Sequence, residues 1–287
     1  MRYVISLSSI PPRFGLIGPA LASLLRQKQR AAAVELWIPA AYRRFPEWTG
    51  NLPAVPDGVT IRRCEADLGP ATKVLPAAKA WRGQGVELLF CDDDHHFDPT
   101  WAQSVQVVRQ DHPEAVLCGM AYSNPQLRRL PEASKRQPRA VISPPSRQQF
   151  GYQLRNLVSA MIPRSGAAMV LQQRHRRVDR AGYADILAGC GGVALRPEFL
   201  DDLAFDMPSV VWAVDDIWLS GHLERRGIPV WADPRLNQAR AYVTTARTAD
   251  LLHANLDGAD REEANSACID YFRATYGIWG GVATQST

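Results

Sequence analysis

The run Val86-Glu87-Leu88-Leu89-Phe90-Cys91-Asp92-Asp93-Asp94 carries the clearest signal in this chain. Its first six residues are mostly apolar and predict a buried strand, and its last three are adjacent carboxylic acids. Adjacent carboxylates repel one another and resist leaving water, so they need water, strong hydrogen bonds or a bound cation at the end of a core strand. Hard oxygen ligands of this kind suit Mg²⁺ or Mn²⁺. The alternative is an acidic turn that caps the following helix.

Strand and helix patterns alternate around this run through residues 1–120. Such alternation predicts an α/β fold with a mostly parallel central sheet flanked by helices. We expect strands over residues 3–7, 34–39, 59–64, 86–91 and 115–120. We expect helices over residues 18–29 and 72–81, and another that begins at Pro99.

The second half of the chain begins with a change in composition. Residues 122–150 are rich in Pro, Arg, Gln and Ser and show little periodicity, which predicts a long loop. Further on we expect a strand over residues 193–195, a helix opened by Pro197, a helix from Asp215 to Arg226, a strand over residues 229–231 and a helix from about Asp260 to Gly277.

Size and charge restrict the class of protein. A chain of 287 residues that is 46% hydrophobic and 22% charged buries a sizeable core and is expected to form one catalytic domain over 1–287. The net charge of +4 and the pI of about 8.9 are mild, and the basic runs are scattered. We therefore expect no nucleic-acid partner. The basic runs form either a solvated face or a contact with anionic headgroups or an anionic acceptor.

Cysteine usage and the N-terminus indicate where the protein works. The five cysteines are far apart, odd in number and form no CxxC pair, which argues against a structural zinc site or a disulfide framework. The apolar run after Met1 is too short for a signal peptide, and no stretch approaches the length of a membrane span. We expect a cytoplasmic protein, attached at most to the inner face of a membrane.

Two acidic motifs resemble those of a known family. The segment Asp92-Asp93-Asp94, followed by Pro99 and Trp101, resembles the DxD segment of GT-A fold glycosyltransferases. The segment Asp215-Asp216-Ile217-Trp218-Leu219 resembles the acidic-pair helix of the inverting, family-two-like members. Segments 8–14, 67–73 and 191–197 match a bacterial group of such transferases in the same order. The resemblance implies a GT-A fold with a Rossmann-like sheet, a nucleotide-binding half (1–120) and an acceptor-binding half (121–287) with a loop at about 122–150.

The resemblance also implies roles for the acidic triplet. Asp94 is expected to hold Mn²⁺ or Mg²⁺ beside the donor diphosphate, and Asp92 is expected to hold the same metal or to bind the donor through its ribose. Asp93 points to the opposite side if the strand stays extended, so it is expected to contact the donor side or to make structural hydrogen bonds. His253 is a candidate third metal ligand, as in many GT-A enzymes. We assign His95 and His96 to a loop.

The remaining site residues divide between the donor and the chemical step. Asp216 is the expected catalytic base, because inversion needs a carboxylate to take the proton of the acceptor hydroxyl. Asp215 is expected to contact a sugar or the acceptor. The alternative for this pair of aspartates is that both serve only to cap the helix that they begin. The donor is expected to be bound by Pro11, Arg13, Asp67, Lys73, Gly191 and Gly192.

By resemblance, the chain is expected to transfer a sugar from a UDP- or GDP-linked donor to a glycan, lipid-linked or other hydroxyl acceptor in bacterial surface polysaccharide or glycan assembly. Two alternatives stay open. A sugar-nucleotide nucleotidyltransferase also uses acidic metal ligands on an α/β sheet, although residues 8–12 are rigid where such an enzyme needs a supple phosphate loop. A non-catalytic nucleotide- or carbohydrate-binding protein of the same fold is the second.

Overall fold

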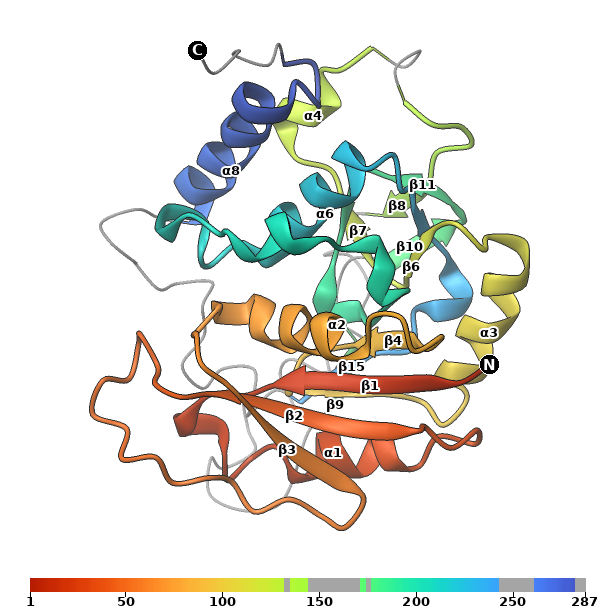
Figure 1. The fold of residues 1–287 in the computed structure, drawn as a ribbon. Helices are drawn as coiled ribbons and strands as arrows, with labels where there is room; N and C mark the ends of the chain where they lie inside the picture. Colours follow the sequence, from red (N-terminus) through yellow and green to blue (C-terminus); the bar gives the residue numbers. More distant parts are fainter. Residues whose placement is uncertain (132–134, 144–170, 174–176, 243–260, 282–287) are drawn as a thin grey trace.

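The central feature of the computed structural model is an eight-stranded sheet (Figure 1). The structure describes residues 1–131, 135–143, 171–173, 177–242 and 261–281. Within this part of the chain the strand order is β3-β2-β1-β4-β13-β6-β14-β11. The bounds are β1 Tyr3–Ser8, β2 Ala33–Pro39, β3 Val59–Cys64, β4 Glu87–Phe90, β6 Val116–Cys118, β11 Gly182–Ala184, β13 Val193–Leu195 and β14 Val230–Ala232.

Six of these eight strands run in one direction. The strands β3, β2, β1 and β4 pair in parallel, as do β6 and β14, whereas β13 is antiparallel to both β4 and β6 and β11 is antiparallel to β14. The expected α/β class with a mostly parallel central sheet flanked by helices is confirmed.

Helices cover both faces of the sheet because the strand side chains alternate between the faces. Tyr3, Ile5 and Leu7 of β1 pack with α1 (Gly18–Leu25) and α3 (Trp101–Asp111). Val4 packs on the other face with α2 (Leu75–Trp81) and with part of α6 (Asp215–Arg225). Figure 1 shows α1 and α2 on opposite sides of β1 and β2.

A third apolar cluster joins α6 to the C-terminal helix. The helix α8 (Arg261–Tyr276) buries Ile269 and Phe272 against Ile217 and Trp218 of α6. Gly277 follows α8 with a φ of 66°, a left-handed conformation that favours glycine at the end of a helix. The helix α6 therefore packs against the sheet on one side and against α8 on the other.

Shorter elements complete the described part of the chain. Three small sheets pair β5 (His95–His96) and β9 (Leu171–Gln173) with β15 (Arg240–Tyr242), β7 (Ala121–Tyr122) with β12 (Ile186–Leu187), and β8 (Val141–Ser143) with β10 (Arg177–Arg180). The short helices are η1 Pro11–Arg13, η2 Gly69–Lys73, α4 Pro125–Arg128, η4 Gly189–Gly191, η5 Pro197–Phe199, η6 Asp202–Phe205, η7 Ser209–Val211 and η8 Pro234–Leu236.

Most predicted elements are found within a few residues of their expected bounds, and four of them need correction. The helix expected at Pro197 is only the three-residue 3-10 turn η5. The first helix ends at Leu25 rather than at residue 29, and a 3-10 turn, η2, precedes α2. The expected loop over 122–150 contains α4 and β8, while 132–134 and 144–150 lie outside the described residues. No helix in the described ranges has both the length and the apolar character needed to cross a membrane.

Candidate functional site

The acidic triplet lies at the carboxyl ends of two neighbouring parallel strands. Ser6 of β1 pairs with Phe90 of β4, so the turn after β1 and the triplet after β4 meet at one edge of the sheet. Ligands of open α/β sheets bind at the carboxyl ends of the strands. The expected placement of the triplet at the end of the fourth strand is thus what the structure shows.

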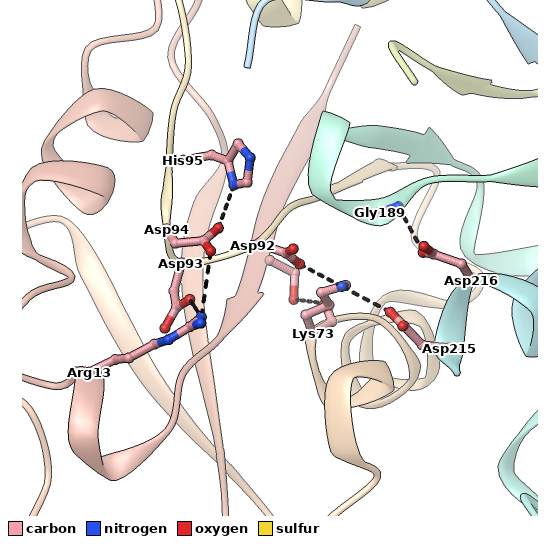
Figure 2. A network of polar contacts seen from close by, with 10 residues as sticks. Arg13, Lys73, Asp92, Asp93, Asp94, His95, Gly189, Asp215 and Asp216 are labelled. Carbon is pink, nitrogen blue, oxygen red and sulfur yellow. Dashed lines mark hydrogen bonds and ion pairs between the residues drawn. The ribbon is translucent and has the colours of Figure 1, made fainter. Parts of the chain in front are cut away.

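Asp93 points into the turn that follows β1 and holds it in place. Arg13 Nη1 donates to Asp93 Oδ1 at 2.8 Å (Figure 2), and the hydroxyl of Ser9 donates to the other carboxylate oxygen. The hydroxyl of Tyr42 donates to the carbonyl oxygen of Ser9 at 2.7 Å. Desolvation raises the pKa of Asp93 to about 6, although the guanidinium of Arg13 opposes that shift. The contacts of Asp93 are therefore structural hydrogen bonds, and they also orient Arg13.

Asp92, Asp94 and His95 form a group that could hold a metal ion. One ligand atom from each lies within 4.8 Å of the other two. The ring Nδ1 of His95 is 2.5 Å from Asp94 Oδ1, and Arg13 Nη1 is 3.7 Å from Asp94 Oδ2. Two carboxylates and one imidazole suit first-row divalent cations, and the imidazole favours Mn²⁺ over Mg²⁺.

The position of His95 differs from the loop assigned to it. His95 is fully buried in β5, where it pairs with Ala241 of β15. Its ring Nε2 is buried and makes no hydrogen bond within the described part of the chain. Adjacency to the triplet was the only sequence signal for His95. Its neighbour His96 belongs to the same strand and contacts the hydroxyl of Tyr242 at 3.1 Å.

Lys73 connects the triplet to the acidic pair of α6. Its ammonium Nζ lies 2.6 Å from Asp92 Oδ1 and 2.9 Å from Asp215 Oδ2. Desolvation lowers the pKa of Lys73, but Asp215 and Asp92 more than offset it, so the pKa is raised well above its ordinary value. For Asp92, desolvation raises the pKa and Lys73 lowers it, with a net lowering. Both partners are therefore charged at neutral pH.

Asp216 faces a different partner from Asp215. Its Oδ1 accepts a hydrogen bond from the backbone N–H of Gly189 at 2.8 Å, as Figure 2 shows. Desolvation raises the pKa of Asp216 to about 7, and the neighbouring Asp215 adds to that rise while Lys73 opposes it. A carboxylate with this pKa exchanges protons near neutral pH. The two aspartates therefore differ in the structure: Asp215 is in an ion pair with Lys73, and Asp216 has a pKa near neutrality.

Gly189 is a site residue that the sequence interpretation missed. A Cβ atom at Gly189 would lie 3.0 Å from Lys73 Nζ and 3.1 Å from Asp216 Oδ1. The expected glycines behave differently. A Cβ at Gly191 would lie 2.6 Å from Met120 Cβ, and Gly192 has a φ of 80° and would meet the rings of Phe97 and Trp101 at 2.7 Å. Packing inside the protein is sufficient to require Gly191 and Gly192.

Asp67 secures the loop between β3 and η2. Its carboxylate accepts hydrogen bonds from the backbone N–H groups of Arg43 at 2.8 Å and Gly69 at 2.9 Å. The indole of Trp212 donates to the carbonyl oxygen of Asp67 at 2.8 Å. Desolvation raises the pKa of Asp67. These bonds tie the expected donor loop to the segment that leads into α6.

The other predicted residues are less informative. Pro11 begins η1, directly after the turn that Asp93 holds. His253 lies outside the described residues. Asp185, a further carboxylate in the second half of the chain, is paired with Arg139 at 2.6 Å and accepts a hydrogen bond from the Ser123 hydroxyl at 3.1 Å, so it does not join the acidic pair of α6.

No protein-family model matches the chain, and no curated protein matches it by sequence. Among solved structures it is similar to Staphylococcus aureus TarS residues 1–349, with 12% identity and a TM-score of 0.44 over 97% of this chain and 72% of that one. The complex of the same fragment with UDP gives 12% identity and a TM-score of 0.43 over 96% and 71%. The longer TarS structure gives 13% and 0.41 over 97% of this chain and 44% of that one. A likeness at this level carries no information about side-chain roles.

Proposed function

We propose that this chain is a metal-dependent glycosyltransferase that moves a sugar from a nucleotide donor to a hydroxyl acceptor, with inversion. One observation carries the proposal. The group Asp92, Asp94 and His95 and the acidic pair of α6 come from distant parts of the sequence, yet Lys73 contacts a member of each at 2.6 and 2.9 Å. A group that could hold a cation thus lies next to the acidic pair that contains the proposed base, an arrangement suited to transfer from a sugar diphosphate.

The metal side of the site is assigned to the triplet and its neighbour. Asp92, Asp94 and His95 would hold Mn²⁺ or Mg²⁺, with His253 as a further candidate ligand. Such an ion, when bound, neutralises charge on the departing diphosphate. Arg13 lies on the metal side of the site, where its Nη1 is held 2.8 Å from Asp93 Oδ1, and it supplies a second positive charge.

The base is assigned to Asp216. A general base works best when its pKa lies near the working pH, and the pKa of Asp216 is raised to about 7. The hydrogen bond from Gly189 fixes the direction of the carboxylate. Asp215 is the weaker candidate because its carboxylate is 2.9 Å from the ammonium of Lys73 and is held in that ion pair. Asp215 is proposed to orient the sugar or the acceptor.

The donor is proposed to be a UDP- or GDP-linked sugar, and the acceptor a glycan, lipid-linked or other hydroxyl compound in bacterial surface polysaccharide synthesis. Residues 1–120 would bind the nucleotide, through Pro11, Arg13, Asp67 and Lys73, and residues 121–287 the acceptor. Gly191 and Gly192 would border the sugar. Peripheral contact with the inner face of a membrane belongs to the same proposal.

The decisive experiment is thermal unfolding of the pure 287-residue chain with UDP or GDP, with and without Mn²⁺. A ligand that binds only the folded state raises the apparent stability by about 2.7 kcal/mol at a hundred times its Kd. We expect a Mn²⁺-dependent rise for one diphosphate and its loss in Asp94→Asn. The matched control is Asp111→Asn, the same chemical change at an exposed residue that ends α3.

The proposal fails if Asp94→Asn and wild type show the same shift with diphosphate and Mn²⁺. A donor hydrolysis assay separates an enzyme from a binding protein, because a transferase slowly transfers the donor sugar to water when no acceptor is present. A nucleotidyltransferase would instead release inorganic pyrophosphate when it is given a nucleoside triphosphate and a sugar 1-phosphate, with formation of the nucleotide sugar.

A further inference from the structure

The ammonium of Lys73 occupies the space between the two halves of the candidate site. Its side chain is only 6% exposed, and a buried ammonium is stable only when carboxylates pair with it. Asp92 Oδ1 at 2.6 Å and Asp215 Oδ2 at 2.9 Å supply the pairing. The Ser6 hydroxyl donates to the carbonyl oxygen of Lys73 at 2.6 Å, which anchors the main chain at this point.

We infer that Lys73 is an internal counter-cation, which neutralises Asp92 in the metal-free protein and must release it when a divalent cation binds. This inference rests on the metal site proposed above. The same carboxylate of Asp92 belongs both to the Lys73 ion pair and to the group that could hold a metal. Two positive charges within a few ångströms of one carboxylate repel each other strongly in a poorly solvated site.

The release of Asp92 has a consequence on the other side of the site. Asp215 then remains as the close ion-pair partner of Lys73 in the structure, at the first turn of α6. Binding of the metal ion on the donor side thereby leaves the positive charge of Lys73 paired with Asp215 of α6, next to the proposed base Asp216. Besides the donor contact proposed above, Lys73 is a positioning residue in this scheme, because it acts on the carboxylates of Asp92 and Asp215.

The test is a titration of the 287-residue chain with Mn²⁺ alone at pH 8, in which electron paramagnetic resonance measures the free ion. Lys73→Met removes the competing charge, so we expect it to bind Mn²⁺ about tenfold more tightly than wild type. It should also melt at a lower temperature than wild type in EDTA and gain more from added Mn²⁺, since its carboxylates lack a counter-charge. The control Lys79→Met removes an exposed lysine of the same helix region and should match wild type.

Each outcome decides something. Equal or weaker Mn²⁺ binding by Lys73→Met, with binding by wild type intact, overturns the inference and leaves the metal site standing. Absence of Mn²⁺ binding by both proteins, with or without UDP, refutes the metal site and the inference together.

If Lys73→Met does not fold, two other variants replace it. Asp215→Asn and Asp216→Asn each remove one carboxylate from the start of α6, but only Asp215 pairs with Lys73. Lys73 pairs with Asp92 alone in Asp215→Asn, so we expect that variant to bind Mn²⁺ several-fold more weakly than Asp216→Asn. Equal affinities would overturn the inference.

Discussion

The substitution Asp216→Asn separates the proposed base from every other part of the site. An asparagine has nearly the same shape and keeps an oxygen that can accept the hydrogen bond from Gly189, which is 2.8 Å long in the structure. It cannot take a proton from an acceptor hydroxyl. Loss of general-base assistance costs about 10²- to 10⁴-fold in rate, so we expect turnover to fall by that factor.

Nucleotide binding by Asp216→Asn should change little, because the contacts proposed for the metal lie on Asp92, Asp94 and His95. The assay is calorimetric titration with UDP or GDP and Mn²⁺, followed by turnover with any working acceptor. Near-wild-type turnover would refute the assignment. A larger rate loss in Asp215→Asn would move the base to the preceding residue.

The pH dependence of the wild-type rate gives a second measure of the same assignment. With a pKa of about 7, the charged fraction of Asp216 falls from about 0.9 at pH 8 to about 0.1 at pH 6. The acidic limb of kcat/KM should therefore have an apparent pKa near 7 and lose about tenfold between these pH values. An acidic limb near pH 4 would show that the titrating carboxylate is an ordinary, solvated one.

Stability supplies the control for folding. The pKa of Asp216 in the folded protein, about 7, lies above its ordinary value of 3.8, so the folded state holds this proton more firmly than the unfolded state does. The resulting stabilisation is present at low pH and is lost as the pH rises from about 4 to about 7. Asp216→Asn lacks this loss, and we expect it to melt no lower than wild type at pH 8.

Two further predictions concern the frame of the site. Gly192→Ala should lower the free energy of unfolding by about 1–3 kcal/mol, because Gly192 has a φ of 80° and a Cβ there would meet the rings of Phe97 and Trp101 at 2.7 Å. Urea unfolding measures this free energy. No change would mean that the turn relaxes freely. Asp93→Asn should weaken diphosphate binding without abolishing Mn²⁺ binding, because it loosens Arg13; calorimetry distinguishes this from equal loss of both ligands.

Local sequence patterns were enough to predict most strands of the sheet and the positions of the two acidic motifs, one after β4 and one at the start of α6. The apolar run that becomes β4 and the triplet after it are adjacent in the sequence, and so are Asp215 and the helix it begins. Their positions follow from strand periodicity and from the side on which parallel strands end.

The parts that sequence reasoning missed depend on contacts between distant residues. His95 becomes a strand residue only because β15 pairs with it, and a two-residue strand leaves no periodic signal. The pairing of Lys73 with Asp215 depends on how α6 packs near η2. Gly189 was overlooked beside Gly191 and Gly192 because a run of glycines does not reveal which of them faces the site.

The position of β13 in the sheet also affects how the chain folds while it is being synthesised. The strands β3, β2, β1 and β4 are complete once residue 90 has been made, but β13, which fills the slot between β4 and β6, is about one hundred residues further along the chain. Until the ribosome has released Val193–Leu195, the edge of β4 that carries Leu88, Leu89 and Phe90 has no partner there. An unpaired apolar edge is an aggregation hazard, and a nascent chain carries that hazard until β13 has been made.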